Sequence, residues 1–285
     1  MTGSHIIKNG RIADAAEAVF RLDDTDVTYG YGCYETLKVR DGVLYFPEFH
    51  EERLLRSAAI LGIATTIRPP EVVDALRLLV RQNAIGDCNI KVMLIGHEGR
   101  SADWYAFMLP ALVAPATAYT EGASCLLFRG ERHFPQAKSL SMLLSTVAFR
   151  EAARQGCWDA LLVNGRGQIT EGTRTNIVYA RPGESSVIYT PPESDVLAGI
   201  TRKTLIAALA GSGITTVERP LGLAEALSGE FGLAMTSTSS RVIPVATLTI
   251  AGSVAPGLPT QPVRLAPSKE IERARVLYDD YLARW

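Results

Sequence analysis

The chain has 285 residues, of which 47% are apolar and 21% charged, and its formal net charge is −1 at neutral pH. A chain of this length and composition can bury a substantial core and is expected to divide into two domains. Its 29 basic residues are spread along the chain and balanced by acidic ones, so we expect a small-molecule ligand and neither nucleic acid nor a membrane surface.

The cysteines and the N-terminus indicate the compartment. The four cysteines lack CxxC spacing and stand in apolar or periodic segments, so we expect buried free thiols in a reducing compartment and no metal site. The opening MTGSHIIKNG has neither the basic nor the apolar region of a leader, and no apolar run approaches the roughly 18 residues of a spanning helix. We therefore place the protein in the cytoplasm.

Hairpins and then helices are predicted in the first part of the chain. The dipeptides Asn9-Gly10 and Asp41-Gly42 separate short apolar runs, which is typical of tight hairpins. Apolar residues at helical spacing predict the helices that follow. The expected elements are strands at 5–8, 34–40 and 43–46, helices after residue 49 and over 71–83, and strands at 90–95 and 104–112.

The second part is again mixed, after an aperiodic segment rich in small residues that we interpret as an interdomain linker. The expected elements are a helix at 140–152, strands at 159–163, 175–180 and 187–190, a helix at 201–210, strands at 215–219 and 232–235, and a last helix around 271–282. We predict an N-terminal α/β domain at 1–113, the linker at 114–122 and a C-terminal α/β domain at 123–285.

Antiparallel hairpins alternating with a few helices favour an α/β (α+β) fold with mixed or antiparallel sheets and flanking helices. The chain has no G-x-G-x-x-G after its first strand and no G-x-x-x-x-G-K-[ST], so a dinucleotide or P-loop site is not supported.

Lys138 is the first candidate for chemistry. It stands just before an apolar helix, at a junction where its amine could enter a cleft, lose its proton through desolvation and bond to a carbonyl carbon. Most lysines are solvated surface charges, and that alternative is the default for Lys138 taken alone.

Four further motifs carry polar groups at element boundaries. They are HEERL at 50–54, TEGTRTN at 170–176, LAGITR at 197–202 and TSTSS at 236–240. Free backbone amides at the start of a helix and a run of hydroxyls both suit an anion such as phosphate. Taken singly, each motif also fits a capped helix, a hairpin end or a polar loop.

Together and in this order, these motifs resemble the fold-type IV pyridoxal-5'-phosphate (PLP) enzymes. That family includes D-amino acid aminotransferases, branched-chain aminotransferases and aminodeoxychorismate lyases. The resemblance covers nearly the whole chain, from YGYGCYET at 29–36 to VIPV at 242–245. Within the family, KSLSMLL at 138–144 and the hydroxyl run are most similar to the D-amino acid enzymes.

The resemblance implies a role for each matching residue. Lys138, within the C-terminal domain, carries PLP and moves the proton between substrate and cofactor, while Glu171 pairs with the pyridine nitrogen. Leu197 packs on the ring and Asn176 braces the turn. The remaining cofactor contacts, mostly to the phosphate, are Arg53, Ile200, Thr201, Ser237 and Thr238.

The chain departs from the D-amino acid enzymes where those bind the substrate carboxylate. The T-R-G arginine of that subfamily is missing from residues 93–98, and Val27 stands where a tyrosine is usual. Another cation is therefore expected to bind the substrate carboxylate, and Arg174 is the first choice. The alternative for Arg174 is that it is a surface residue at a hairpin tip. The candidate substrate contacts are Tyr29, Tyr31, Lys91, His97, Arg174, Ser239 and Arg241.

The function expected from this resemblance is a PLP-dependent transaminase that acts on amino acids of the D- or branched-chain type and on α-keto acids by a ping-pong cycle. The alternatives are a lyase similar to the aminodeoxychorismate enzymes and a PLP-binding homologue without turnover. The resemblance also implies a homodimer.

Overall fold

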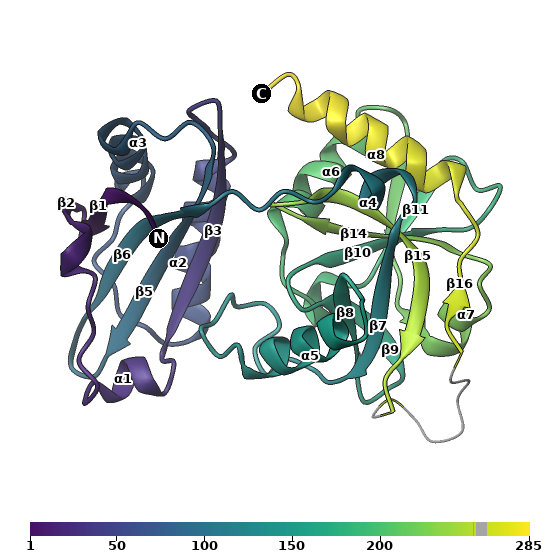
Figure 1. The fold of residues 1–285 in the computed structure, drawn as a ribbon, viewed down its shortest axis with the longest axis horizontal. Coiled ribbons are helices and arrows are strands. Elements are labelled where there is room, and N and C mark those ends of the chain that lie inside the picture. Colours follow the sequence, from purple (N-terminus) through teal and green to yellow (C-terminus); the bar gives the residue numbers. More distant parts are fainter. Residues whose placement is uncertain (253, 255–260) are drawn as a thin grey trace. The chain divides into compact units, whose positions relative to one another are not determined.

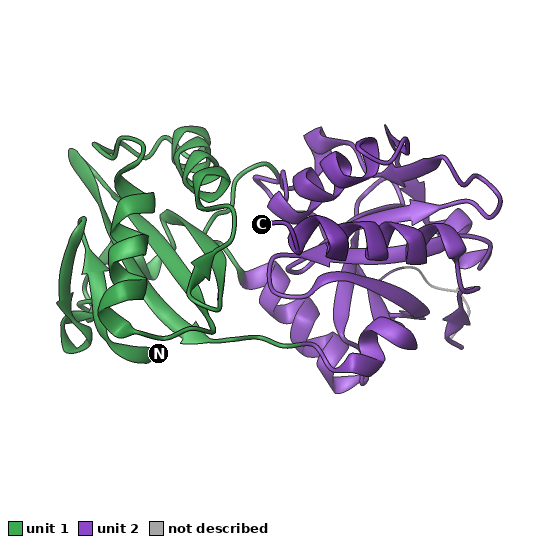
Figure 2. Ribbon diagram, turned by 90° about the horizontal axis from the view of Figure 1, so that it is seen from above, with its two compact units in different colours: residues 1–113, 136–142 green, residues 114–135, 143–285 purple. Residues whose placement is uncertain are grey.

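The computed structural model describes residues 1–252, 254 and 261–285, which form two compact units (Figures 1 and 2). Unit 1 comprises residues 1–113 and 136–142, and unit 2 comprises residues 114–135 and 143–285. The boundary after Val113 coincides with the predicted end of the first domain. The structure differs from the predicted division in two respects, because residues 114–122 belong to unit 2 and the segment containing Lys138 belongs to unit 1.

Unit 1 is built on a six-stranded antiparallel sheet with the order β2-β1-β6-β5-β3-β4. Its strands are β1 (Thr2–Lys8), β2 (Arg11–Asp14), β3 (Gly32–Arg40), β4 (Val43–Leu44), β5 (Cys88–His97) and β6 (Arg100–Pro110). Both predicted hairpin turns are present: Asn9, Gly10, Asp41 and Gly42 have φ of 49°, 80°, 51° and 77°. Two successive positive φ values match the twist of the flanking strands.

Helices α2 (Pro47–Ile60) and α3 (Glu71–Asn83) pack on this sheet and contribute to its core. A 3₁₀ turn, η1 (Ala15–Glu17), and the short helix α1 (Thr25–Thr28), which buries no residue, precede β3. Contacts join α2 to β3 and α3 to β1. The α3 bounds agree with the sequence prediction because the buried Val72, Leu76 and Leu79 recur at helical spacing. The core of unit 1 lies between these helices and the inward side chains of β3 and β5.

Unit 2 contains a ten-stranded mixed sheet with the order β12-β11-β10-β14-β15-β7-β8-β9-β13, and β16 pairs with β15. Its strands are β7 (Ala123–Arg129), β8 (Asp159–Val163), β9 (Gln168–Gly172), β10 (Asn176–Ala180), β11 (Val187–Thr190), β12 (Thr215–Glu218), β13 (Leu221–Gly222), β14 (Gly232–Ser237), β15 (Arg241–Ile250) and β16 (Val263–Arg264). The β7–β8, β7–β15 and β11–β12 pairs are parallel.

The helices of unit 2 begin slightly differently from the predictions. They are α4 (Ala116–Thr120), α5 (Leu143–Arg154), α6 (Ile200–Ala210), α7 (Leu223–Leu227) and α8 (Lys269–Leu282), with a 3₁₀ turn, η2 (Glu193–Asp195). Helix α5 starts at Leu143 because the residues before it pair with β3 in unit 1. Helix α6 starts at Ile200, one residue before the predicted start at residue 201, and Gly199 is its N-cap. Among the described residues, no helix is long and apolar enough to span a membrane.

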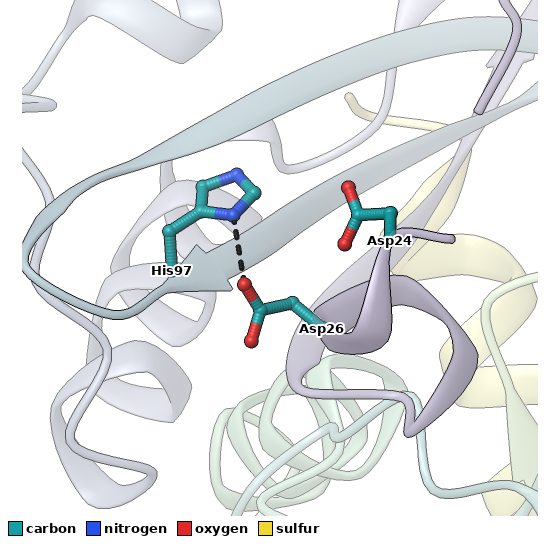
Figure 3. A group of neighbouring side chains, drawn as sticks. All are labelled: Asp24, Asp26 and His97. Carbon is teal, nitrogen blue, oxygen red and sulfur yellow. Dashed lines mark hydrogen bonds and ion pairs between the residues drawn. The ribbon is translucent and has the colours of Figure 1, made fainter. Parts of the chain in front are cut away.

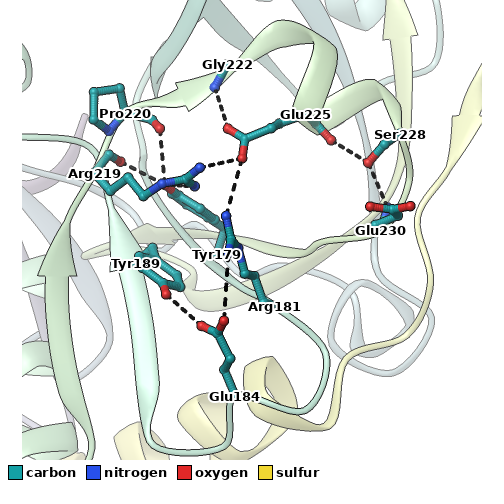
Figure 4. Close-up of polar contacts among 10 residues, drawn as sticks. All are labelled: Tyr179, Arg181, Glu184, Tyr189, Arg219, Pro220, Gly222, Glu225, Ser228 and Glu230. Carbon is teal, nitrogen blue, oxygen red and sulfur yellow. Dashed lines mark hydrogen bonds and ion pairs between the residues drawn. The ribbon is translucent and has the colours of Figure 1, made fainter.

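A polar network in unit 2 fixes the strands around β10 (Figure 4). Tyr179 is fully buried, its ring stacks on Tyr189 at 5.3 Å, and its hydroxyl donates to the carbonyl oxygen of Arg219 at 2.9 Å. The Arg219 guanidinium pairs with Glu225 of α7 at 2.5 Å. This network joins β10, β11 and the segment before β13, and the sequence patterns did not predict it.

Two neighbouring leucines of α3 test this packing. Leu79 is fully buried, whereas Leu78 is 37% exposed. We expect Leu79→Ala to lower the free energy of unfolding by about 2–5 kcal/mol, because it removes methyl groups from a packed core and leaves a cavity. Leu78→Ala should cost less than about 1 kcal/mol. Denaturant unfolding followed by circular dichroism measures both, and equal losses would contradict the assigned face of α3.

Candidate active site

Lys138 is held in place through its backbone. It lies in the segment Gln136–Met142, where its carbonyl accepts from the Tyr34 amide at 2.9 Å and its own amide donates to Ser57 Oγ at 3.0 Å. The Leu140 amide donates to the carbonyl of Gly32 at 2.9 Å. These bonds attach the segment to β3 and to α2, so the main chain of Lys138 has a fixed position relative to both elements.

The side-chain amine of Lys138 has an unusual setting. Its Nζ lies 4.6 Å from the centre of the Tyr34 ring, and the residue is half-buried. Across the part of the chain that the structure describes, this amine pairs with no carboxylate. An amine that is partly desolvated and not neutralised by an acid is suited to bond covalently to a carbonyl carbon.

A buried ion pair lies on the other face of β3. Both carboxylate oxygens of Glu35 accept from Arg53 of α2, each at 2.7 Å, and His50 Nδ1 lies 2.7 Å from Glu35 Oε2. Burial by itself would raise the pKa of Glu35, but the Arg53 charge and its hydrogen bonds outweigh it, with His50 assisting, and lower the pKa to about 2. Glu35 is therefore ionised, and Arg53 has a fixed orientation.

His50 keeps one nitrogen without a partner. Burial lowers the pKa of His50, more strongly than the nearby Glu35 charge raises it. The Nε2 atom of His50 is buried and accepts from no donor among the described residues. Of these three residues, only Arg53 was predicted to have a role, although the alternation of β3 places the charged Glu35 on the buried face of the strand.

A second histidine, His97, is fully engaged (Figure 3). Its Nδ1 lies 3.1 Å from Asp26 of α1 and its Nε2 lies 3.0 Å from Asp103 of β6, while Asp24 lies close by. Because each ring nitrogen already faces a carboxylate, neither is left for the substrate contact that the sequence predicted. The arrangement instead joins α1 to the β5–β6 hairpin.

The tyrosine and lysine candidates of unit 1 lie in different settings. Tyr29 is 83% exposed, and the hydroxyl of Tyr31 donates to the carbonyl of Gly62 at 3.2 Å. Lys91, on β5, places its Nζ 5.0 Å from the Tyr34 ring centre. The structure therefore brings Lys91 to the same ring as Lys138, and it leaves Tyr29 in solvent.

In unit 2, both oxygens of Glu171 are occupied. Arg132 Nε donates to Oε1 at 2.7 Å, and the Leu197 amide donates to Oε2 at 3.2 Å. Arg132 also donates to the carbonyl of Pro135. The guanidinium and the backbone amide therefore fix the orientation of this carboxylate. No sequence pattern marks Arg132, because it lies in an aperiodic loop after β7.

Asn176 braces the turn before α6. Its side-chain amide donates to the carbonyl of Leu197 at 2.9 Å, and a Cβ placed on Gly199 would overlap with its Oδ1. Gly199 has no side chain to cap α6, and the first residues of this helix, Ile200 and Thr201, are buried. A buried helix start without a side-chain cap is suited to an anion.

The hydroxyl run forms the turn between β14 and β15. Ser237 Oγ accepts from the amide of Ser240 at 3.1 Å, and Thr238 and Ser239 lie half-buried in the turn. The Oγ1 atom of Thr236 is buried and has no partner among the residues that the structure describes. Arg241, next in the chain, pairs with Asp279 of α8 at 2.8 Å.

Arg174 points its charge at an aromatic ring. Its guanidinium lies 3.8 Å from the centre of the Phe149 ring. The positive charge of Arg174 also acts to lower the pKa of the buried Asp159. Asp159 itself accepts from Thr173 at 2.5 Å and from Thr175 at 3.0 Å, which fixes the turn after Glu171. Burial raises the pKa of Asp159, and these two hydroxyls and Arg174 only partly offset the effect.

Comparison with known proteins identifies the family. The family model described as amino-transferase class IV matches residues 32–248. The chain belongs to this family. The match begins with β3 and ends within β15, so it contains Lys138 and every other residue singled out above except those before residue 32 and Asp279.

Relatives of the chain have three kinds of names. The chain is 29% identical to a D-alanine aminotransferase of Bacillus licheniformis, over 93% of this chain and 96% of that one. It is 29% identical to a putative branched-chain-amino-acid aminotransferase of Methanocaldococcus jannaschii, over 84% and 86%. It is 27% identical to a bifunctional aminodeoxychorismate lyase and D-amino acid transaminase of Mycobacterium tuberculosis, over 84% and 89%.

Solved structures show the same fold. The Escherichia coli branched-chain amino acid aminotransferase superposes with a TM-score of 0.82 at 22% identity, over 99% of this chain and 94% of that one. A hypothetical aminotransferase from Mycobacterium tuberculosis in its PLP-bound form gives 0.79 at 24% identity, over 98% and 99%. The two-unit α/β architecture is therefore that of fold-type IV aminotransferases, whose cofactor is PLP.

The residues of each unit fit this cofactor. Unit 1 offers the amine of Lys138, which pairs with no acid among the described residues, and unit 2 offers the fixed carboxylate of Glu171. The buried start of α6 lacks a side-chain cap, and the buried Thr236 Oγ1 lacks a partner in the described part of the chain. Groups of this kind are satisfied by a bound anion such as the phosphate of PLP.

The Glu35 ion pair predicts a specific acid response. Since its pKa is about 2 in the folded protein and 4.5 is its ordinary value, the pair contributes on the order of 3 kcal/mol that is present above pH 4.5 and lost as the pH falls toward 2. Glu35→Gln should therefore be much less stable than wild type at pH 7, and the difference should shrink below pH 4.5. Unfolding titrations across this range measure it, with the exposed Glu48→Gln as a control whose difference stays small.

Gly199 should matter for cofactor binding. In Gly199→Ala the new Cβ displaces Asn176, which releases the Leu197 carbonyl and disturbs the first turn of α6. We expect about tenfold or weaker binding of PLP, measured by fluorescence titration. Gly211→Ala, at the other end of α6, is the matched control, because its Cβ meets only ordinary contacts at 3.5 Å. Equal affinities in the two variants would argue against this role of the turn.

Proposed function

We propose that the chain transfers the amino group of an amino acid to an α-keto acid with Lys138 as the residue that bonds to the cofactor. The observation that carries this proposal is the half-buried Lys138 amine, which lies at the Tyr34 ring and pairs with no acid among the described residues. When bound, PLP would supply the carbonyl carbon that carries the amino group between donor and acceptor and a ring that withdraws electrons. The remaining chemistry is assigned to the chain's own groups.

Lys138 is proposed as both base and acid. With PLP bound, the free Lys138 amine would remove the proton from the substrate α-carbon as a base, and the resulting ammonium would return that proton as an acid. The three hydrogen bonds to its segment support this role, because a base must be within reach of one fixed carbon atom.

Glu171 is proposed to pair with the pyridine nitrogen. Arg132 and the Leu197 amide hold its carboxylate in place, and a carboxylate at this place would pair with the protonated nitrogen of a bound ring, which would then withdraw electrons from the substrate carbon. Leu197 is proposed to pack on the ring, and Asn176 to brace the turn that follows it.

The phosphate is assigned to the first turn of α6 at Ile200 and Thr201 and to the turn at Ser237 and Thr238. Amides and hydroxyls of this kind suit a phosphate group. Arg53 completes the set as a cation whose orientation Glu35 fixes. Ser239 is kept as a substrate contact beside this turn.

The amino donor is proposed to be of the D-amino acid or branched-chain type, since relatives with both names are equally similar at 29% identity. A lyase reaction that releases pyruvate from aminodeoxychorismate is the second candidate, favoured by the bifunctional relative from Mycobacterium tuberculosis. Both activities need the same lysine, so only substrates separate them.

We further propose a homodimer in the cytoplasm. Met93, Tyr105 and Phe107 lie half-buried on the sheet face of unit 1 that turns away from its core, and a second copy is the proposed cover. All four cysteines are buried and free, which supports a reducing compartment.

Visible absorption tests the central proposal. Wild-type protein mixed with PLP should show the band of a lysine-bound cofactor, and D-alanine, L-leucine or another amino acid should bleach it, with α-ketoglutarate restoring it. Lys138→Ala should lose the band and at least about 1,000-fold of activity, because no other residue is assigned to the covalent step.

The control is Lys269→Ala, an exposed lysine at the start of α8, which should behave as wild type. A band that persists in Lys138→Ala would contradict the assignment of the lysine. A band that no amino acid bleaches, together with pyruvate release from aminodeoxychorismate, would indicate the lyase instead.

A further inference from the structure

Two neighbouring residues of the last helix, α8, are bonded to the two segments to which the phosphate is assigned. Helix α8 buries Ile271, Ala274 and Tyr278 at helical spacing, and it contacts α6, β10, β14 and β15 (Figure 1). Tyr278 is the only one of these three with a polar group in its side chain. Asp279 follows it and is half-buried. The first of the two residues reaches α6, and the second reaches the turn between β14 and β15.

The hydroxyl of Tyr278 begins a chain of hydrogen bonds into the first turn of α6. It lies 3.1 Å from Thr204 Oγ1, and the Thr204 hydroxyl donates to the carbonyl of Ile200 at 2.9 Å. A hydroxyl has a single proton. Because the Thr204 proton is directed to Ile200, the Tyr278 hydroxyl is the donor to Thr204. All three groups are buried.

This chain of hydrogen bonds acts on an amide that is assigned to the phosphate. The carbonyl of Ile200 and the N–H of Thr201 belong to the same peptide group. Hydrogen bonds in a chain polarise one another, so a bond accepted by this carbonyl makes the N–H of the same peptide a stronger donor. The Thr201 amide is therefore better suited to an anion when the Tyr278 bond is made.

Asp279 holds the end of the turn between β14 and β15. Its Oδ1 accepts from Arg241 at 2.8 Å, and its Oδ2 accepts from Arg275 at 3.1 Å. Arg241 pairs with Ser237 across the turn and has a φ of 56°. This left-handed conformation is rare for a residue with a side chain and persists where the surroundings hold it. Here Asp279 and the ring of Tyr119, 5.5 Å from the guanidinium, do so.

We propose that Tyr278 and Asp279 are positioning residues for the cofactor phosphate, so that α8 sets the affinity of the protein for PLP. Tyr278 acts through Thr204, and Asp279 acts through Arg241. The inference rests on the proposed function, which assigns the phosphate to these two turns. Neither residue is assigned to the substrate or to proton transfer, so their loss should weaken PLP binding and leave kcat at saturating PLP within a few-fold.

The test compares PLP with pyridoxal, which can form the same bond to Lys138 but has no phosphate. Fluorescence titration measures the affinity of both for wild type, Tyr278→Phe and Asp279→Asn. We expect PLP to bind about three- to tenfold more weakly to each variant, because each loses one interaction that orders a phosphate-binding turn. Pyridoxal should bind to both variants as it does to wild type. General damage to the fold would weaken both ligands equally.

Two matched controls make the same chemical changes elsewhere in unit 2. Asp280→Asn changes the next residue of α8, which is exposed. Tyr189→Phe removes a hydroxyl that donates to Glu184 at 2.6 Å, outside both turns. Both controls should bind PLP with the affinity of wild type.

A double variant tests the route from Tyr278 through Thr204. Thr204→Val removes the hydroxyl that lies between Tyr278 and the Ile200 carbonyl. Residues that act through a shared partner have non-additive effects. Tyr278→Phe should therefore cost less PLP affinity in the Thr204→Val background than in wild type.

Equal weakening of PLP and pyridoxal, or an equal cost of Tyr278→Phe in the two backgrounds, would overturn the inference. Unchanged PLP affinity in Tyr278→Phe or in Asp279→Asn would overturn the role of that residue. These outcomes are distinct from failure of the proposed function, which is measured as absence of amino transfer by PLP-loaded wild-type protein, whatever the affinities of the variants.

Discussion

The attachment of the Lys138 segment to β3 is the constraint on which the candidate active site depends. Two backbone hydrogen bonds to Gly32 and Tyr34 and one to the Ser57 hydroxyl fix the lysine's main chain. A lysine on a free loop would retain its rotamer freedom and its full hydration. Here the backbone of Lys138 is held by hydrogen bonds, and its side-chain amine lies at the ring of Tyr34 in the absence of a ligand.

Two buried carboxylates, each with its own arginine, give the two units their fixed charges. Glu35 and Arg53 lie in unit 1, and Glu171 and Arg132 lie in unit 2. Burying such pairs is favourable only when the geometry is good and the remaining hydrogen bonds are made, and His50 and the Leu197 amide supply them. In unit 1, Glu35 thus stays ionised where burial alone would favour its neutral form, and in unit 2 the two donors fix the orientation of Glu171.

Local patterns were sufficient for much of the fold and for part of the site. The hairpin turns and α3 follow from residue type and periodicity, and the order of motifs identified the family that the comparisons confirm. The unit that contains Lys138 was not predictable in this way, because its pairing with β3 joins residues about a hundred positions apart. Arg132 was missed for a similar reason, since no periodicity marks its loop, whereas the alternation in β3 could have revealed Glu35.

The chain passes from unit 1 to unit 2, back to unit 1 and again to unit 2, which limits where two relatives could be recombined. Because residues 136–142 leave unit 2 to complete unit 1, neither unit is a continuous stretch of sequence. A fragment ending at Val113 would expose the edge of β3 near Cys33, and unpaired strand edges promote aggregation. A fragment beginning at Ala114 would carry Lys138 without the strand that fixes it. Halves of two relatives joined at this boundary would therefore have to match at β3 and at the lysine segment together, which links the evolution of these two distant stretches.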